Sequence, residues 1–192
     1  MTDICAIVLA AGEGSRFGGD DHKLRTRFKG KPLVLWAVEA ALAAQNDDGP
    51  VFGDVYVVTG AVDLLDLLPE TVTVVENHSW ADGQAVSLRA GVAQAEREGY
   101  QSVVVGLGDQ PLVPASAWET VANADGAVVT ATFDGHRTPP VKFTADVWGL
   151  LPISGDEGAR GLLRRRPELV QEIACDGRAV DIDTLSDLDR WG

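Results

Sequence analysis

A glycine-rich segment near the N-terminus combines the residue types that bind a phosphate chain. It reads Leu9-Ala10-Ala11-Gly12-Glu13-Gly14-Ser15-Arg16-Phe17-Gly18, and Lys23 follows it. Glycines let a backbone turn sharply and bring successive N–H groups close to phosphate oxygens. Arg16 and Lys23 would add fixed positive charge, which favours a triphosphate site over a purely structural turn. The segment lacks the Gly-Lys-Ser/Thr of a Walker loop and the third glycine of a dinucleotide fingerprint.

Two aspartates follow apolar runs and are candidate metal ligands. Asp109 stands in Gly106-Leu107-Gly108-Asp109-Gln110-Pro111, and Asp183 stands in Asp181-Ile182-Asp183-Thr184. A carboxylate at the end of a parallel strand lies where open α/β sheets bind ligands, and its oxygens suit Mg²⁺. If the two side chains converge, they could share one Mg²⁺. Each also has an ordinary explanation as a helix cap, near Pro114 for Asp109 and before a closing helix for Asp183.

A third segment, from Asn77 to Arg89, has the composition of a loop that enters a helix. Gly83 would allow close approach of a base or ribose, because it has no side chain. Ser87 follows one helical turn later and could form a hydrogen bond with the same group.

The charge distribution narrows the class of ligand. The chain has 192 residues and a formal net charge of -13, which argues against a nucleic-acid surface because phosphate backbones are bound by clustered Lys and Arg. Six of its 16 basic residues nevertheless fall in one short segment whose acidic residues are Asp20 and Asp21: Arg16, Lys23, Arg25, Arg27, Lys29 and Lys31. A basic patch beside a glycine loop favours a small anionic ligand; a solvated charged loop is the alternative.

The elements that must position these residues alternate along the chain. Apolar runs predict strands at 4–9, 55–59, 72–75, 103–107 and 127–131. Amphipathic spacing predicts helices from Pro32, as first helical residue, to residue 42, and at 61–68, 84–97 and 115–123. This order predicts an α/β sandwich with a mostly parallel sheet, its first strand buried on both faces.

The part after Pro139-Pro140 is less regular. We expect strands at 141–143, 169–173 and 179–182 and a helix at 157–165, and we expect this part to supply the acceptor side of a cleft. Cys5 and Cys175 lack the spacing of a zinc site or disulfide framework and are expected to be buried packing residues. With no apolar run of membrane-spanning length and no signal-like start, the sequence predicts one cytoplasmic domain over 1–192.

Taken in order, these segments resemble the molybdenum cofactor nucleotidyltransferases (MobA-like NTP transferases), most of all their molybdopterin cytidylyltransferase branch. The resemblance covers almost the whole chain. Besides the glycine loop and the Asp109 and Asp183 motifs, it includes these segments: Gly30-Lys31-Pro32-Leu33, Trp80 to Gly83, Ser87-Leu88-Arg89-Ala90-Gly91 and Ser154-Gly155-Asp156-Glu157-Gly158-Ala159-Arg160.

The resemblance implies a Rossmann-like three-layer α/β/α sandwich of the nucleotide-diphospho-sugar transferase type. It implies Mg²⁺ as cofactor, held by Asp109 and Asp183, with Arg16, Lys23 and Asp109 in catalytic roles. The substrates implied are CTP, with GTP less favoured, and a small phosphorylated acceptor such as molybdopterin; Ala10-Ala11 and Gln110 look like the CTP-using branch. The nucleotide-binding residues implied are Leu9, Ala10, Ala11, Gly12, Gly14, Ser15, Arg16, Lys23, Gly83, Ser87 and Gly108.

One segment departs from the branch. This chain has Thr138-Pro139-Pro140 where Gly-His-Pro is usual, in a stretch expected near the acceptor, and His136 could substitute by a shift in the loop. Three alternatives stay open: a sugar- or polyol-phosphate nucleotidyltransferase, an NAD(P)H-dependent oxidoreductase, and a non-catalytic chaperone that delivers a cofactor to a molybdoenzyme. The incomplete Gly-x-Gly-x-x-Gly fingerprint argues against the oxidoreductase. No membrane or nucleic-acid partner is expected.

Overall fold

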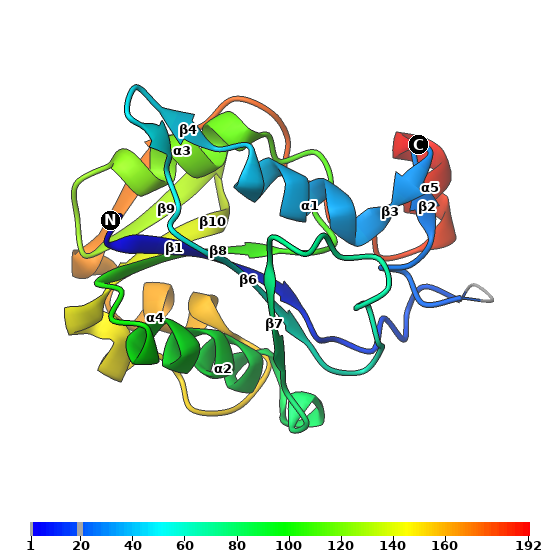
Figure 1. Ribbon diagram of the computed structural model, residues 1–192, viewed down its shortest axis with the longest axis horizontal. Helices are drawn as coiled ribbons and strands as arrows, with labels where there is room; N and C mark the ends of the chain where they lie inside the picture. Colours follow the sequence, from blue (N-terminus) through cyan, green and yellow to red (C-terminus); the bar gives the residue numbers. More distant parts are fainter. Residues whose placement is uncertain (1, 19–20) are drawn as a thin grey trace.

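A central sheet lies between two layers of helices in the computed structural model, which describes residues 2–18 and 21–192 (Figure 1). Met1, Gly19 and Asp20 lie outside the described residues; Asp20 is one of the two acidic residues of the basic segment. The sheet has seven strands in the order β11-β9-β10-β8-β1-β6-β7. Their bounds are β1 Ile4–Ala10, β6 Val55–Thr59, β7 Thr73–Glu76, β8 Ser102–Leu107, β9 Val128–Phe133, β10 His136–Thr144 and β11 Val170–Ala174.

The strand directions confirm the predicted α/β class. β1 pairs in parallel with β6 and β8, β6 with β7, and β9 with β11, whereas β10 runs antiparallel to β8 and β9. The predicted strand at 141–143 is therefore the end of a longer strand that returns from β9 through a tight turn at Asp134 and Gly135, both of positive φ.

Helices cover both faces of the sheet (Figure 1). α1 (Leu33–Leu42) and α3 (Ala115–Asn123) lie on one face, and α2 (Gln84–Arg97) and α4 (Ala159–Arg165) lie on the other. β1 feeds both layers, because alternate side chains of a strand point to opposite faces. Val8 belongs to the core under α1 and α3, and Ile7 belongs to the core under α2.

Shorter elements complete the fold. α5 (Leu185–Trp191) lies beside a short hairpin formed by β2 (Arg27–Phe28) and β3 (Lys31–Pro32). A second short hairpin, of β4 (Gln45–Asn46) and β5 (Gly49–Pro50), lies near α3. Single 3-10 turns lie at η1 (Trp80–Asp82), η2 (Ala145–Leu150) and η3 (Pro167–Leu169). Among the described residues, no helix is long and apolar enough to cross a membrane.

Two predictions about helices need correction. Residues 61–68 form turns rather than a helix: the Asp63 carboxylate accepts a hydrogen bond from the N–H of Leu65 at 2.9 Å, which competes with helical bonding at the start of the segment. Leu64 is still buried, so the spacing of apolar residues correctly indicated burial but did not indicate a helix. Pro32 is not the first helical residue but precedes it, with the extended ψ of 138°.

The predicted strand at 179–182 is also wrong. The segment has no regular secondary structure and pairs with no described strand of the sheet. Instead the Ile182 N–H donates to the carbonyl of Asp109 at 3.0 Å, and the Arg178 N–H lies 3.4 Å from the carbonyl of Leu112. Cys175, expected in a buried strand, lies just past β11 and is half-buried, whereas Cys5 is fully buried as expected.

Candidate functional site

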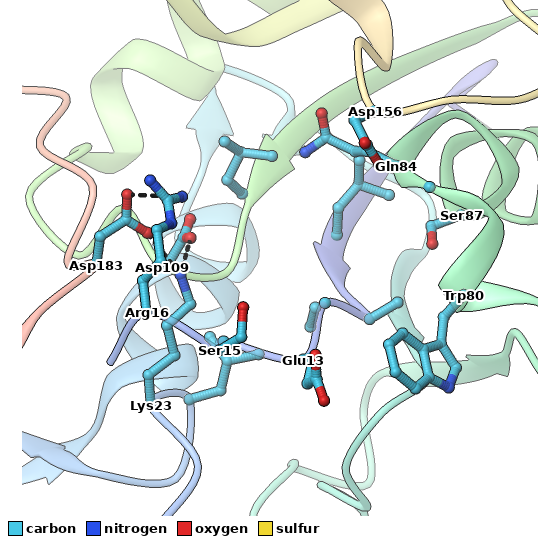
Figure 2. Close-up of a pocket in the computed structure, with 18 of the residues that line it drawn as sticks. Glu13, Ser15, Arg16, Lys23, Trp80, Gln84, Ser87, Asp109, Asp156 and Asp183 are labelled. Carbon is cyan, nitrogen blue, oxygen red and sulfur yellow. Dashed lines mark hydrogen bonds and ion pairs between the residues drawn. The ribbon is translucent and has the colours of Figure 1, made fainter. Parts of the chain in front are cut away.

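A cavity of about 330 Å³ opens where β1 and β8 end, between the glycine loop and the start of α2. Leu9 of β1 is the register partner of Leu107 of β8, so the loop after β1 and the turn after β8 leave the sheet side by side. Every predicted site residue except Gly108 lines this cavity. Figure 2 shows two ends, which we name by their residues: a charged end (Arg16, Lys23, Asp109, Asp183) and an α2 end (Trp80, Gly83, Ser87, Asp156).

The charged end is organised around the ammonium of Lys23. Its Nζ donates to Oδ2 of Asp109 at 2.6 Å and to Oδ1 of Asp183 at 3.0 Å, and only 11% of the lysine side chain is exposed. Burial alone would lower the pKa of Lys23, but the two carboxylates more than offset it, so its pKa lies above the usual value. The two aspartates, 74 positions apart in the chain, are brought to one cation.

Backbone contacts bring Asp183 to this position. Ile182 is fully buried, and its N–H bond to the Asp109 carbonyl ties the C-terminal segment to the turn after β8. Neither aspartate caps a helix: α3 begins without a side-chain cap, and α5 is capped by Thr184 in a capping box with Asp187. The ordinary explanations for both carboxylates are therefore wrong.

The donor set at the charged end fits a divalent metal ion. Carboxylate oxygens are hard ligands, and Mg²⁺ in proteins is held by one or two carboxylates together with substrate phosphates. Among the described residues there is no group of three or more His, Cys, Asp or Glu side chains that could hold a metal unaided. Asp109 and Asp183 beside the glycine loop would match this arrangement of carboxylates and substrate phosphates.

The basic segment divides into two groups. Arg16 reaches Asp183, with Nη2 3.0 Å from Oδ2, although 76% of its side chain is exposed. Arg25 instead makes a paired contact with Asp66 on the turns at 61–68. The other three basic residues lie on or beside the β2–β3 hairpin and make contacts there. Arg27 donates to the carbonyl of Gly30, whereas Lys29 lies over the Phe28 ring and Lys31 over the Trp36 ring. Of the basic patch predicted from the sequence, only Arg16 and Lys23 belong to the described lining of the cavity.

The glycine loop has space where a phosphate chain would need it. A Cβ added at Gly12 would meet no atom within 4 Å, and Gly14 has the positive φ of 67° that favours glycine. His22 holds the loop: its Nδ1 accepts from the N–H of Leu24 at 3.2 Å, and its Nε2 lies 3.0 Å from the carbonyl of Gly12. Burial lowers the pKa of His22, which favours the neutral ring these two bonds require. The sequence analysis missed this residue.

Gly108 acts on the position of Asp109 and does not line the cavity. Its N–H donates to the carbonyl of Leu9 at 2.9 Å, and a Cβ here would lie 3.2 Å from that same oxygen. Close packing of the turn against β1 therefore accounts for this glycine, and the implied contact with the nucleotide remains a prediction.

Gly83 at the α2 end is also required by the protein itself. A Cβ at this position would lie 2.5 Å from the carbonyl carbon and oxygen of Gly155, and φ is 107°. Two backbone bonds fix the approach: the Gly155 N–H donates to Asp82 at 3.1 Å, and the Ala85 N–H donates to the Gly155 carbonyl at 2.9 Å. The segment 154–158 fills the side-chain space at Gly83, although Gly83 still lines the cavity; close approach of a base or ribose there remains a prediction.

Ser87 lies at the α2 end with a fixed partner. Asn77 is buried, and its Nδ2 donates to Oγ of Ser87 at 2.9 Å, while its Oδ1 accepts from the N–H of Ser79 at 3.0 Å. The Ser87 hydroxyl keeps its own proton to donate toward the cavity. From the sequence, Asn77 was only the first residue of a predicted loop. In the structure its buried side chain holds Ser87 in place.

A second cavity of about 450 Å³ adjoins the first and shares Leu9, Gln84 and Leu107 with it. Gln110 projects here, and its Nε2 donates to Asp181 at 2.8 Å and to Thr138 at 3.1 Å. Burial, followed by the charge of Asp109, raises the pKa of Asp181. The lining also includes Pro139 and three arginines: Arg137, Arg160 and Arg164.

The segment that departs from the branch therefore lines the second cavity through Thr138 and Pro139. His136 pairs with Phe133 at the exposed turn of the β9–β10 hairpin, and it is absent from the described lining of both cavities. The suggested substitution of His136 for the missing histidine is not supported.

The fold and the site together define a class: an α/β enzyme in which a glycine loop, a buried lysine and two carboxylates surround a phosphate-sized end of one cavity. Residues 6–171 match the family described as the MobA-like NTP transferase domain, and the chain belongs to that family. It is an enzyme of the nucleotidyltransferase type, as the resemblance predicted.

Known proteins are similar to this chain over nearly its whole length, in sequence or in fold. Nicotine blue oxidoreductase of Paenarthrobacter nicotinovorans is 29% identical over 203 residues, which cover 97% of this chain and 95% of that protein. A nucleotidyl transferase structure from Methanothermobacter has a TM-score of 0.79 and 26% identity, covering 97% of this chain and 94% of that one. Rv0371C of Mycobacterium tuberculosis H37Rv in complex with manganese has a TM-score of 0.81 at 23% identity, covering 99% and 98%.

Proposed function

We propose that this enzyme transfers CMP from CTP to a phosphorylated acceptor, molybdopterin or a related cofactor, and releases pyrophosphate, with Mg²⁺ as its cofactor. One observation carries the proposal: the ammonium of Lys23 contacts both Asp109 and Asp183 beside an open glycine loop. This arrangement supplies cation, metal ligands and backbone donors in one place, which is what transfer at a phosphorus centre requires.

The reaction is an in-line displacement at the α-phosphorus of CTP. An oxygen of the acceptor phosphate forms the new O–P bond, the bond to the β-phosphate oxygen breaks, and pyrophosphate leaves with the electron pair. No nucleophilic Ser or Cys is needed, because positioning and charge stabilisation supply most of the effect. Lys23 and Arg16 hold the triphosphate charge while the N–H groups of the glycine loop orient its oxygens.

Asp109 and Asp183 would hold the metal. Mg²⁺ bound there would neutralise negative charge on the phosphates and orient them. The manganese in the complex of Rv0371C, a protein of the same fold, is consistent with a divalent ion in this family. The choice of magnesium over manganese is part of the proposal.

The second cavity is the proposed acceptor site. It adjoins the nucleotide cavity across Leu9 and Leu107, so an acceptor bound there lies beside the nucleotide phosphates. Its three arginines suit a phosphorylated, anionic molecule. The departure at Thr138 and Pro139 lies in this cavity, so acceptor choice is where this chain is expected to differ from the cytidylyltransferase branch.

The test is pyrophosphate release from CTP with Mg²⁺ and a panel of acceptors: molybdopterin, a sugar 1-phosphate and a polyol phosphate. Asp109→Ala should lower turnover by a factor of about 10²–10³, because it removes one ligand of the metal and one partner of Lys23. Asp66→Ala is the matched control, since that carboxylate pairs with Arg25 away from both cavities. Near-normal turnover in Asp109→Ala would refute the assignment.

The name of one relative favours a second candidate. Because the nicotine blue oxidoreductase is similar over nearly the whole chain, an NAD(P)H-dependent reaction on the same fold is the alternative. It predicts tight binding of NADPH or NADH without Mg²⁺ and no pyrophosphate release with any acceptor. A fluorescence titration with both reduced nicotinamides, run beside the transferase assay, separates the two.

A further inference from the structure

We infer that Asp156 selects the base of the nucleotide, by accepting a hydrogen bond from an exocyclic amino group and so favouring CTP over UTP. The inference rests on the proposed function, because it assumes that a nucleoside triphosphate occupies the first cavity. Asp156 stands in the Ser154 to Arg160 segment, to which the motifs assign no role of its own. Its position in the cavity carries the argument.

The charges of the cavity orient the nucleotide. Of the described lining residues, Arg16 and Lys23 are the basic ones, and both lie at the charged end (Figure 2). The triphosphate must lie near them, because phosphate oxygens carry most of the ligand's negative charge. The base is then directed to the α2 end, where Trp80, Ser87 and Asp156 line the wall.

Asp156 is held by its neighbours at this end. Gly155 is bonded through its backbone to both sides of Gly83, and Oδ1 of Asp156 lies 2.8 Å from the position a Cβ would take at Gly83. On the other side, Gly158 packs against Gln84, whose Oε1 is 2.4 Å from the position of a Cβ there. The segment is clamped on α2, so it offers its carboxylate from a fixed backbone.

The carboxylate has no competing partner within the described part of the chain. Its neighbour Glu157 pairs with Arg164, but Asp156 forms no ion pair with residues 2–18 or 21–192. An ionised carboxylate only accepts hydrogen bonds. Cytosine presents an amino group at C4, whereas uracil presents a carbonyl oxygen there, as thymine does, so the same oxygen of Asp156 would attract one base and repel the other.

Calorimetry with Mg²⁺ and without acceptor tests the inference, using CTP and UTP as the probes. Wild-type protein should bind CTP at least about tenfold more tightly than UTP, the size expected for one hydrogen bond to a charged group. Asp156→Asn can both donate and accept, so the ratio of the two dissociation constants should fall toward one. Asp156→Ala should weaken CTP binding and strengthen UTP binding, because it removes both the attraction for the amino group and the repulsion of the carbonyl oxygen.

Asp82→Asn is the matched control. It removes the same charge next to Gly83, but its side chain does not belong to the described lining, and its backbone carbonyl still holds Gly155. It should keep the wild-type ratio. If Asp156 only stabilises the start of α2, Asp156→Asn will lower the melting temperature and change the affinities for CTP and UTP equally; that result overturns the inference.

The failure of the proposed function looks different. If wild-type protein binds neither CTP nor UTP with Mg²⁺, the nucleotide assignment fails and the role of Asp156 fails with it. If it binds CTP tightly and Asp156→Asn keeps the full CTP preference, only the role of Asp156 is wrong.

Discussion

The two ends of the first cavity are held together by different kinds of contact. At the charged end, side chains from three distant segments meet directly, with Lys23 between Asp109 and Asp183. At the α2 end, the decisive contacts are between backbones: a Cβ at Gly83 would lie 2.5 Å from the Gly155 carbonyl, which backbone hydrogen bonds hold in place. One end depends on charge and the other on the absence of side chains.

This difference between the two ends predicts which substitutions should affect each of them. A charge removed from the charged end leaves unbalanced charge behind, and an added cation can compensate for it. An atom added at the α2 end moves the segment that carries Asp156, and no ion can compensate for that. Stability and binding measurements can therefore separate the two designs.

The largest effect is expected for Lys23→Met. Without the ammonium, Asp109 loses its cationic partner and Asp183 keeps only the exposed Arg16, so turnover should fall by a factor of about 10²–10³. The free energy of unfolding should fall by about 2 kcal/mol in metal-free buffer, because hydrogen bonds to charged groups are lost. Added Mg²⁺ should restore most of that stability, since it binds the folded state between the same carboxylates. Thermal melts with and without Mg²⁺ measure this.

Arg25→Met is the control for that variant. Arg25 pairs with Asp66 on an exposed turn, and surface ion pairs contribute no more than about 1 kcal/mol. Its melting temperature should change little and should not depend specifically on Mg²⁺. Equal behaviour of the two variants would mean that the Lys23 cluster is an ordinary surface ion pair, which would remove the basis for a metal site.

The charged end was predictable because the types of its residues indicate its chemistry. A glycine loop with Arg16 and Lys23, and aspartates after apolar runs, predicted the cation and carboxylates without any knowledge of packing. The sequence did not predict how Asp183 is positioned: the segment 179–182, expected to be a strand, is a loop held by a hydrogen bond to the Asp109 carbonyl. Apolar residues such as Ile182 indicate burial, but they do not distinguish a strand from an anchored loop.

The α2 end was predicted only in part. Gly83 lies in the cavity as expected, but its close contact with Gly155 was not predicted, because that contact joins segments more than 70 residues apart. A sequence shows that a position lacks a side chain and does not show which atom approaches it. The same holds for Asn77 and His22, whose roles depend on partners that only the fold brings together.

An intermediate effect is expected for Gly83→Ala. The new Cβ would overlap the Gly155 carbonyl and would also adopt an unfavourable positive φ, so the free energy of unfolding should fall by about 2–3 kcal/mol. CTP should bind more weakly, and Mg²⁺ should not restore the stability. Denaturant unfolding and calorimetry measure the two changes.

Gly99→Ala separates the two causes. Gly99 has a similar positive φ of 84°, but a Cβ there would meet nothing within 4 Å. It should lose only the backbone contribution, about 1 kcal/mol, and bind CTP normally. If both glycine variants lose equal stability, close packing of the segment 154–158 on Gly83 does not hold the α2 end.

The smallest effect is expected for Asn77→Ala. This change removes the donor that holds Ser87 and the acceptor that holds the N–H of Ser79, but the serine hydroxyl can still turn toward the nucleotide. Stability should fall by about 1 kcal/mol and CTP affinity by a few fold, because the serine becomes free to rotate rather than lost. Ser87→Ala should weaken CTP binding further while it changes stability less. If Asn77→Ala instead weakens CTP binding more than Ser87→Ala does, Asn77 acts on the nucleotide by a route other than the serine. Side chains at the α2 end would then matter as much as its backbone.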